Sequence, residues 1–358
     1  MTERSNAETP AATVGAAGGR ALRRLAAPMR AGEWWEHKLA PILAMFYATS
    51  LSLDRGIAAL APSLLLLLAA LIPGAAYVSI INDLADRDDD RRAGKANRMA
   101  GASPGLVCLA LGLPVAAGLA VAWHWRDDPL LLGLYLAAWV SFTLYSVPPF
   151  RLKARGLAGL VADASGAHLF PTLVAVLLAC RASGAAPDPV WLGGAGLWAF
   201  AHGLRGILWH QLLDSDADEA GGVRTFVQRV PRGRALALGR FVAWPVELAA
   251  LTLLLWNLGE AGPVIGLLLY ALLVRQRLRI FRMQAVIVEP RPRHLLLLNE
   301  YYSLFLPVSL LAQSMLATPV DGLVLLAHLI VFPVGAAAAV RDVWKLRRSA
   351  FLPSLRAR

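Results

Sequence analysis

The chain has 358 residues, of which 57% are hydrophobic and 16% are charged, and its mean hydropathy is +0.55. This composition excludes an ordinary soluble domain and indicates a membrane protein. The net charge of +11 lies in short basic clusters between apolar segments, without an aromatic-basic stripe for stacking bases, so it predicts membrane topology and no nucleic-acid partner.

Residues 1–32 are rich in Ala, Gly and Arg and contain no apolar core of signal-peptide length. They are expected to form a disordered basic tail, with a cleaved organelle transit peptide as the alternative. Residues 33–345 are expected to form one transmembrane domain, and residues 346–358 a basic cytoplasmic tail.

Apolar segments predict an all-α fold, a polytopic bundle of nine or ten transmembrane helices. The ten candidates lie near residues 39–53, 58–81, 104–123, 129–147, 157–180, 189–212, 236–257, 262–274, 301–317 and 321–340. The first and eighth segments have the shortest purely apolar stretches. Amphipathic flanks at 33–38 and 275–282 can extend these two helices into the membrane interface.

The basic residues predict the orientation of these helices. With the N-terminus in the cytoplasm, 31 of the 35 Lys and Arg fall on the cytoplasmic side, and only Arg55, Arg126 and Arg181 lie in outer loops. This satisfies the positive-inside rule, and it favours an even number of spans because nine would place the basic C-terminal end outside. We expect a multi-pass protein of the cell (inner) membrane with both termini in the cytoplasm.

The first acidic cluster reads NDLADRDDD over residues 82–90, at the cytoplasmic end of the second span. In a continuous helix Asn82, Asp86 and Asp90 share one face, and Asp83 joins them through Asp86. Like charges at this spacing cost about 0.2–0.5 kcal/mol per pair, so a bound cation is expected. Two basic residues follow the cluster, Lys95 and Arg98.

The second acidic cluster lies at the same end of the sixth span, where Asp214 and Asp218 are one helical turn apart and Arg224 follows. Either cluster alone is typical of a solvated loop. Two clusters at one membrane depth, each followed by basic residues, favour a diphosphate bridged by Mg²⁺, because Mg²⁺ prefers carboxylate and phosphate oxygens.

A third segment, YSVPPFRLK over residues 145–153, follows the fourth span. Its two prolines end the helix at the interface. Tyr145 then faces the mouth of the bundle, as a cation-stabilising ring or a hydrogen-bond donor, and Arg151 and Lys153 lie near the phosphates. An ordinary helix end with interfacial anchors is the alternative.

These segments resemble the motifs of the UbiA prenyltransferase superfamily over about residues 35–320. Its NDxxDxxxD motif matches Asn82, Asp83, Asp86 and Asp90, and its DxxxDxxxGxxT motif matches Asp214, Asp218, Gly222 and Thr225. The segment from Tyr145 to Lys153 is similar to the family's YSxPPxRxK. The chain differs in having Arg98-Met99 where the family often has Arg-Pro, and ten predicted helices where the family usually has nine.

The resemblance implies a magnesium-dependent transferase that moves an isoprenyl group from an isoprenyl diphosphate to an aromatic or quinone-precursor acceptor. Membrane lipid and a lipophilic or aromatic acceptor are its expected partners. The implied metal ligands are Asn82, Asp83, Asp86, Asp90, Asp214 and Asp218. The implied catalytic residues are Asp86, Asp214 and Tyr145, and the implied substrate-binding residues are Asn82, Lys95, Arg98, Ser146, Arg151, Lys153 and Arg224.

Three other functions stay open. A membrane terpene cyclase uses the same motifs but captures the cation within the substrate's own chain, and phosphoribosyl transfer to a polyprenyl phosphate is also known in the superfamily. A cation transporter predicts acids near the bilayer midplane with broken helices there.

Four polar residues inside the spans also need an explanation. Arg205, within the sixth span, is expected either to pair with an internal acid such as Glu247 or to reach phosphate from an unwound helix end. His168, His202 and His210 are expected either to line an acceptor site or to be satisfied interior histidines.

Overall fold

The computed structural model describes residues 31–356 of the chain, which are almost entirely helical. Residues 1–30 of the expected N-terminal tail lie outside the described part. The helices and helical turns of the first half are α2 (Ala31–Trp34), η2 (Trp35–Leu39), α3 (Ala40–Ser52), η3 (Ala58–Leu60), α4 (Ala61–Ala85), α5 (Arg87–Arg92), α6 (Pro104–His124), α7 (Pro129–Ser146), η4 (Leu152–Ala154), α8 (Leu157–Ala164), η5 (Ser165–Leu169) and α9 (Phe170–Ala182).

The second half continues the bundle and adds one small pair of strands. Its elements are α10 (Pro189–Leu213), α11 (Ser215–Gly221), α12 (Phe226–Arg229), α13 (Arg232–Leu238), η6 (Gly239–Ala243), α14 (Trp244–Leu258), α15 (Ala261–Ile280), β1 (Gln284–Val286), β2 (His294–Leu296), η7 (Tyr301–Phe305), α16 (Leu306–Ala317), η8 (Pro319–Asp321), α17 (Gly322–Val331) and α18 (Pro333–Arg356). The strands are parallel, with Gln284 opposite His294.

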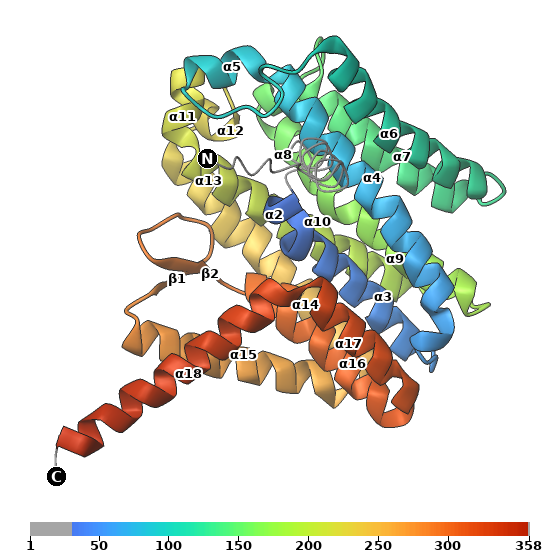
Figure 1. Ribbon diagram of the computed structural model, residues 1–358, viewed down its shortest axis with the longest axis vertical. Helices are drawn as coiled ribbons and strands as arrows, with labels where there is room; N and C mark the ends of the chain where they lie inside the picture. Colours follow the sequence, from blue (N-terminus) through green and yellow to red (C-terminus); the bar gives the residue numbers. More distant parts are fainter. Residues whose placement is uncertain (1–30, 357–358) are drawn as a thin grey trace, which may run out of the picture.

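The long helices run side by side as one bundle, and α18 projects from it towards the C-terminus (Figure 1). Six helices in the described part are long and apolar enough to cross a membrane: Ala58–Ala85, Pro104–His124, Pro129–Ser146, Leu157–Ala182, Arg232–Leu258 and Ala261–Ile280. Large apolar side chains on their outer faces are exposed, among them Leu119, Phe241 and Trp256. A surface of this kind belongs in lipid, so the chain is a multi-pass membrane protein.

Helices occupy all ten segments predicted to be apolar spans, although only six meet the length and composition of a span unaided. Helix α15 extends through the basic flank to Ile280, as expected. Helix α10 has 25 residues but is not among the six, because His202, Arg205 and Gln211 interrupt its apolar sequence.

The tenth candidate span, near residues 321–340, is helical but not one straight helix. The chain bends by 84° between Pro319–Val331 and Pro333–Leu346, and counting this bent pair as one span gives seven. Pro333 lacks an amide hydrogen and excludes helical geometry from the residue before it, so Phe332 is non-helical, with φ −122° and ψ 66°.

Prolines also define where helices begin. Three helices start with a proline directly after a capping residue, whose side-chain oxygen accepts a backbone N–H three residues later: Ser103 for α6, Asp128 for α7 and Asp188 for α10. The proline needs no hydrogen bond at this position, because the first helical N–H has no partner within the helix.

Each of the four π-helical turns in residues 31–356 ends two residues before a proline. The turns η2, η5, η6 and η7 precede Pro41, Pro171, Pro245 and Pro307. A proline removes one helical hydrogen bond and its ring crowds the preceding turn, and a π turn absorbs this by inserting one residue. Two of these turns, η2 and η5, contribute Lys38 and His168 to an internal cavity.

Candidate active site

The two acidic clusters meet at one end of the bundle, where α5 packs against α11 (Figure 1). The guanidinium Nε of Arg92 donates to the carbonyl oxygen of Gly221 over 3.2 Å. A Cβ at Gly221 would lie 3.2 Å from the carbonyl oxygen of Asp89, a tight contact that glycine avoids where the two backbones approach closely.

The first cluster keeps its helical spacing across a helix junction. Helix α4 ends at Ala85 and α5 begins at Arg87, with Asp86 between them. The amide of Asp86 still donates to the carbonyl of Asn82 at 2.9 Å, and the amide of Asp90 donates to that of Asp86 at 2.8 Å. The shared face predicted for Asn82, Asp86 and Asp90 is therefore preserved.

The second cluster crosses a similar junction between α10 and α11. The amide of Asp218 donates to the carbonyl of Asp214 at 2.9 Å, which keeps the two residues one turn apart. Gly222 then ends α11 in the left-handed region, at φ +75°, which glycine adopts without a steric cost. The chain turns back there and brings Thr225 to the same cavity as the carboxylates.

A cavity of about 200 Å³ separates the two clusters. All six predicted metal ligands line it, and so do Tyr145, Lys95 and Lys153. His210 and Thr225, which the sequence analysis had noted, also line it, and four residues that sequence reasoning did not select complete its wall: Asp89, Ala96, Gln211 and Val223. Arg98 and Arg224, predicted near the phosphates, are not among the lining residues.

Basic side chains pair with the carboxylates of this cavity. Lys153 binds Asp86, and Arg151 donates both to Asp86, at 3.1 Å, and to Asp89. On the opposite wall, Lys95 Nζ lies 3.1 Å from Asp214 Oδ2 and 3.6 Å from Asp218 Oδ1. Arg151 and Lys153 come from the loop after α7, so this loop is bound directly to the first acidic cluster.

Burial and charge shift the pKa values of two groups in this cavity. Burial raises the pKa of Asp218, and the charge of Lys95 only partly offsets it. Burial lowers the pKa of Lys95, but its hydrogen bond to Asp214 and the neighbouring carboxylate charges outweigh this and raise it overall. Lys95 therefore stays an ammonium, while Asp218 gains from any further cation placed beside it.

Neutral side chains orient the carboxylate clusters. Ser146 Oγ donates to Asn82 Oδ1 at 2.6 Å. Asn97 Nδ2 donates to Asp90 Oδ2 and to the backbone carbonyl of Asp83, each at 2.7 Å. Sequence reasoning missed Asn97. The only feature of the sequence that pointed to it was its position shortly after the first acidic cluster.

Gln211 is buried in the wall of the same cavity, and its Nε2 has no hydrogen-bond partner among the described residues. Its Oε1 accepts the amide of Val227, which leaves the amide nitrogen as the free end. A buried donor without a partner is costly, so it is available to an acceptor atom of a ligand.

Two further cavities continue inward from the carboxylates. A central cavity of about 520 Å³ shares Asn82, Tyr145 and His210 with the first cavity. An apolar cavity of about 120 Å³ shares Lys38, Phe142 and others with the central one. The shared residues place the three cavities next to one another, from the carboxylate end to the space between α4 and α7.

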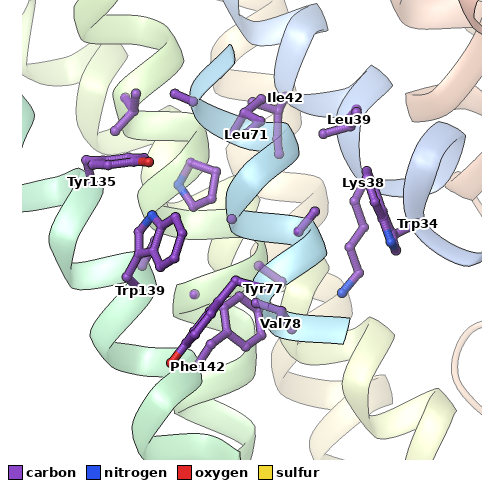
Figure 2. Close-up of a pocket in the computed structure, with 18 of the residues that line it drawn as sticks. Trp34, Lys38, Leu39, Ile42, Leu71, Tyr77, Val78, Tyr135, Trp139 and Phe142 are labelled. Atoms are coloured by element: carbon purple, nitrogen blue, oxygen red, sulfur yellow. The ribbon is translucent and has the colours of Figure 1, made fainter. Parts of the chain in front are cut away.

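Aromatic rings form one wall of the apolar cavity. Figure 2 shows Tyr135 and Trp139 on one side of it, opposite Leu39 and Lys38. The ring of Tyr77 lies 4.8 Å from that of Trp139, and its hydroxyl bonds Thr143 Oγ1 at 2.8 Å. This wall is fixed by ring contacts and one hydrogen bond, and it suits a flexible apolar chain.

Of the two alternatives for Arg205, pairing with an internal acid is confirmed. Its Nε and Nη2 donate to the two carboxylate oxygens of Glu247, at 2.6 and 2.7 Å, and its Nη1 donates to the carbonyl of Ile287 at 3.1 Å. Both side chains are fully buried. Arg205 thus joins α10 to α14 and to the segment after β1. The three histidines His168, His202 and His210 all line the central cavity.

This bundle, with two acidic helix ends around one cavity, defines a helical membrane protein with a charged cavity at one end. The sequence profile of the UbiA prenyltransferase family matches residues 39–286, so the chain belongs to this family.

The curated and solved relatives agree with this placement. A lycopene elongase/hydratase of Halobacterium salinarum is 30% identical over 187 residues, which cover 49% of this chain and 61% of that protein. The fold is similar to that of a UbiA homolog from Archaeoglobus fulgidus bound to GPP and Mg²⁺, with a TM-score of 0.54 and 17% identity, over 82% of this chain and 98% of that one.

Proposed function

We propose that this protein transfers an isoprenyl group from an isoprenyl diphosphate to an aromatic or quinone-precursor acceptor and releases diphosphate. The observation that carries the proposal is the order of three neighbouring cavities, one with paired carboxylates and lysines, a central one and an apolar one, each sharing lining residues with the next. Such an order matches a substrate with a charged head, a reacting carbon and a hydrocarbon tail.

The residues of the first cavity fit Mg²⁺ as cofactor. Their donors are carboxylate and amide oxygens, from Asn82, Asp83, Asp86, Asp90, Asp214 and Asp218, which Mg²⁺ prefers. Among the residues that the structure describes, no three Asp, Glu, His or Cys side chains lie close enough to hold a metal alone. Mg²⁺ typically takes its other ligands from phosphate and water, and when bound it would act as a Lewis acid towards the leaving diphosphate.

The basic residues of this cavity are suited to bind the diphosphate rather than the metal. Lys95, Arg151 and Lys153 are paired with the same carboxylates that would bind the metal. We propose that they exchange these partners for phosphate oxygens when the substrate binds, and neutralise the charge that develops on the departing diphosphate. Tyr145 lines both the first and the central cavities, so its position suits stabilisation of the allylic cation at their boundary.

The walls of the central cavity favour an acceptor with polar groups. The relative from Halobacterium salinarum is named for lycopene, a hydrocarbon, which makes a hydrocarbon acceptor the second candidate. The cavity of this chain, however, has many polar residues beside apolar ones in its wall, among them His37, Lys38, Asp163, His168, His202, His210, His294 and Asn299. A hydrocarbon would leave these groups unsatisfied, whereas a hydroxylated or quinoid ring can pair with them.

The test is incubation of purified protein with labelled geranyl, farnesyl and geranylgeranyl diphosphates, Mg²⁺ and a panel of hydroxylated benzoates, naphthoates and lycopene. We expect a prenylated hydroxyarene that disappears with EDTA and returns with added Mg²⁺. Elongated lycopene would establish the second candidate. A cyclic terpene formed without acceptor would establish a cyclase, and no turnover of any diphosphate would contradict the proposal.

We further propose that the protein lies in the cell (inner) membrane with both termini and the carboxylate end in the cytoplasm. The support is the distribution of Lys and Arg, 31 of 35 of which fall on one side when each of the ten candidate segments crosses the membrane once. A reporter fused after Arg358 should be active only in the cytoplasm. Activity only on the outer face would contradict this orientation.

A further inference from the structure

Asp163 is a carboxylic acid inside a membrane-spanning segment that the proposed function leaves without a role. It lies near the end of α8, within Leu157–Ala182, and lines the central cavity together with Tyr145, His168 and His210. Within residues 31–356 it forms no hydrogen bond and no ion pair. The charged or titratable groups that act on it are Lys38 of η2, His210 of α10 and Tyr145 of α7.

An acid inside a membrane-spanning segment is costly, and it persists where it is paired or functional. Glu247 is the paired case, because both of its carboxylate oxygens accept hydrogen bonds from Arg205. Asp163 has no such partner. Its carboxylate instead faces a cavity of about 520 Å³ in which an acceptor would lie.

Transfer of a prenyl group to a ring carbon must also remove a proton from that carbon. The carboxylates at the mouth are unsuited to accept it, because they are paired with Lys95, Arg151 and Lys153 or would be bound to metal. A proton on His168 would add positive charge beside Lys38 and His202, both of which act on that ring. A carboxylate in the central cavity becomes neutral when it takes the proton, which is favoured in a site shielded from water.

We propose that Asp163 is the catalytic base that accepts this proton, an inference that rests on the proposed transferase function. The carbon–oxygen bond of the allylic diphosphate breaks, and its electron pair leaves with the diphosphate. A π-electron pair of the acceptor ring forms the new carbon–carbon bond. The carbon–hydrogen bond at the same ring carbon then breaks, its electron pair restores the aromatic ring, and the proton goes to a carboxylate oxygen of Asp163.

Asp163 must lose this proton before the next turnover. The central cavity that it lines shares Asn82, Tyr145 and His210 with the carboxylate cavity, so water entering at the carboxylate end can take the proton. Asp163 is then a carboxylate again when the next acceptor binds.

The test compares Asp163→Asn with Asp163→Glu and with Asp127→Asn, a matched control whose side chain is 82% exposed and lies outside the cavities. Geranyl diphosphate, Mg²⁺ and whichever hydroxyarene of the panel the native protein prenylates are the probes. Prenylated product and released diphosphate are measured separately, at matched levels of inserted protein. We expect Asp163→Asn to lose about 10²–10⁴-fold in product formation, the range typical of a general base, with geraniol taking its place and diphosphate release changed less than about threefold.

Asp163→Glu should regain at least part of the transfer. Its kinetic isotope effect, the ratio of the rates with unlabelled and ring-deuterated acceptor, should be larger than that of the native protein, because a displaced base makes proton removal rate-limiting. Asp127→Asn should match the native protein in both readouts. If Asp163→Asn does not insert, the isotope effect of Asp163→Glu decides, and an unchanged effect overturns the inference.

Prenylation by Asp163→Asn within about threefold of the native rate would also overturn it, since a general base is worth far more. Equal loss of product and diphosphate release would do the same, because it would assign Asp163 to ionisation or folding. If the native protein prenylates no hydroxyarene, the proposed function itself fails, which this design separates from failure of the base.

Discussion

Two ion pairs, one formed by a residue within α10 and one by the residue that follows it, differ in their access to water. Arg205 and Glu247 are both 0% exposed, whereas Lys95 and Asp214 at the end of the helix are each 34% exposed. The two sites are nine residues apart, about 13 Å along a helix. Ion pairs of the same kind are therefore found both in the buried middle of α10 and at its exposed end.

The difference in exposure decides what each pair can do. A buried pair cannot release one partner without leaving an uncompensated charge in a medium of low polarity, at a cost of about 3–5 kcal/mol. A pair at a hydrated helix end is worth about 1 kcal/mol or less, so a multivalent ligand can replace either partner. Arg205–Glu247 accordingly connects helices, whereas under the proposed function the carboxylates at the mouth exchange their basic partners for a metal and a diphosphate.

The largest effect is expected at the mouth. Asp86→Ala or Asp214→Ala should each reduce magnesium-dependent turnover at least about a thousandfold, or about 4 kcal/mol, because each removes a proposed metal ligand. Membrane insertion should be unchanged, since both residues lie at helix ends. Steady-state assays at matched protein levels measure this, with Asp88→Asn, 78% exposed, as the control. Near-native turnover in either alanine variant would remove that residue from the site.

Substitutions in the buried Arg205–Glu247 pair should instead change the stability of the protein. Glu247→Gln leaves the guanidinium of Arg205 without its counter-charge and should cost about 3–5 kcal/mol of the free energy of unfolding. Thermal unfolding in detergent measures this loss. The double variant Arg205→Met with Glu247→Met should regain much of it, because no orphaned charge remains. An unchanged melting temperature in Glu247→Gln would show that the pair contributes little.

Lys153 tests whether a cation paired with Asp86 in this structure acts on the diphosphate during turnover. Lys153→Met should cut kcat by about tenfold to a thousandfold, or roughly 1.4–4 kcal/mol, because negative charge accumulates on the leaving oxygen in the transition state. Lys153→Arg should recover part of this loss. A mere interfacial anchor would leave both kcat and KM unaltered.

The smallest effect is expected at Ser146, which donates to Asn82 from α7. Ser146→Ala removes one hydrogen bond, worth about 0.5–1.5 kcal/mol, and should lower kcat/KM about two- to tenfold. Ser183→Ala is a matched control, because that hydroxyl bonds the carbonyl of Ala179 at the end of α9, away from the site. A loss equal to that of the control would indicate no positioning role.

The sequence alone determined the features that depend on neighbours within about two helical turns. The period of 3.6 residues places Asn82, Asp86 and Asp90 on one face, and the hydrogen bonds across the Asp86 junction preserve it. Apolar length located the helices, and prolines located several of their ends. The bend at Pro333 had the same local signal, although the sequence analysis located only a candidate span near residues 321–340 and no bend within it.

Only the tertiary structure decided which distant residues meet. Asp89 lies off the predicted face of its own helix, yet Arg151 binds it from 62 residues away. Asp163 is one polar residue in an apolar segment, and only the packing of α4, α7, α8 and α10 makes it part of a cavity wall. Periodicity encodes direction around a single helix axis, but the rotation and crossing of helices depend on the side chains of all their neighbours together. For that reason the acidic motifs could be predicted from the sequence, while the cavity that joins them to a possible base could not.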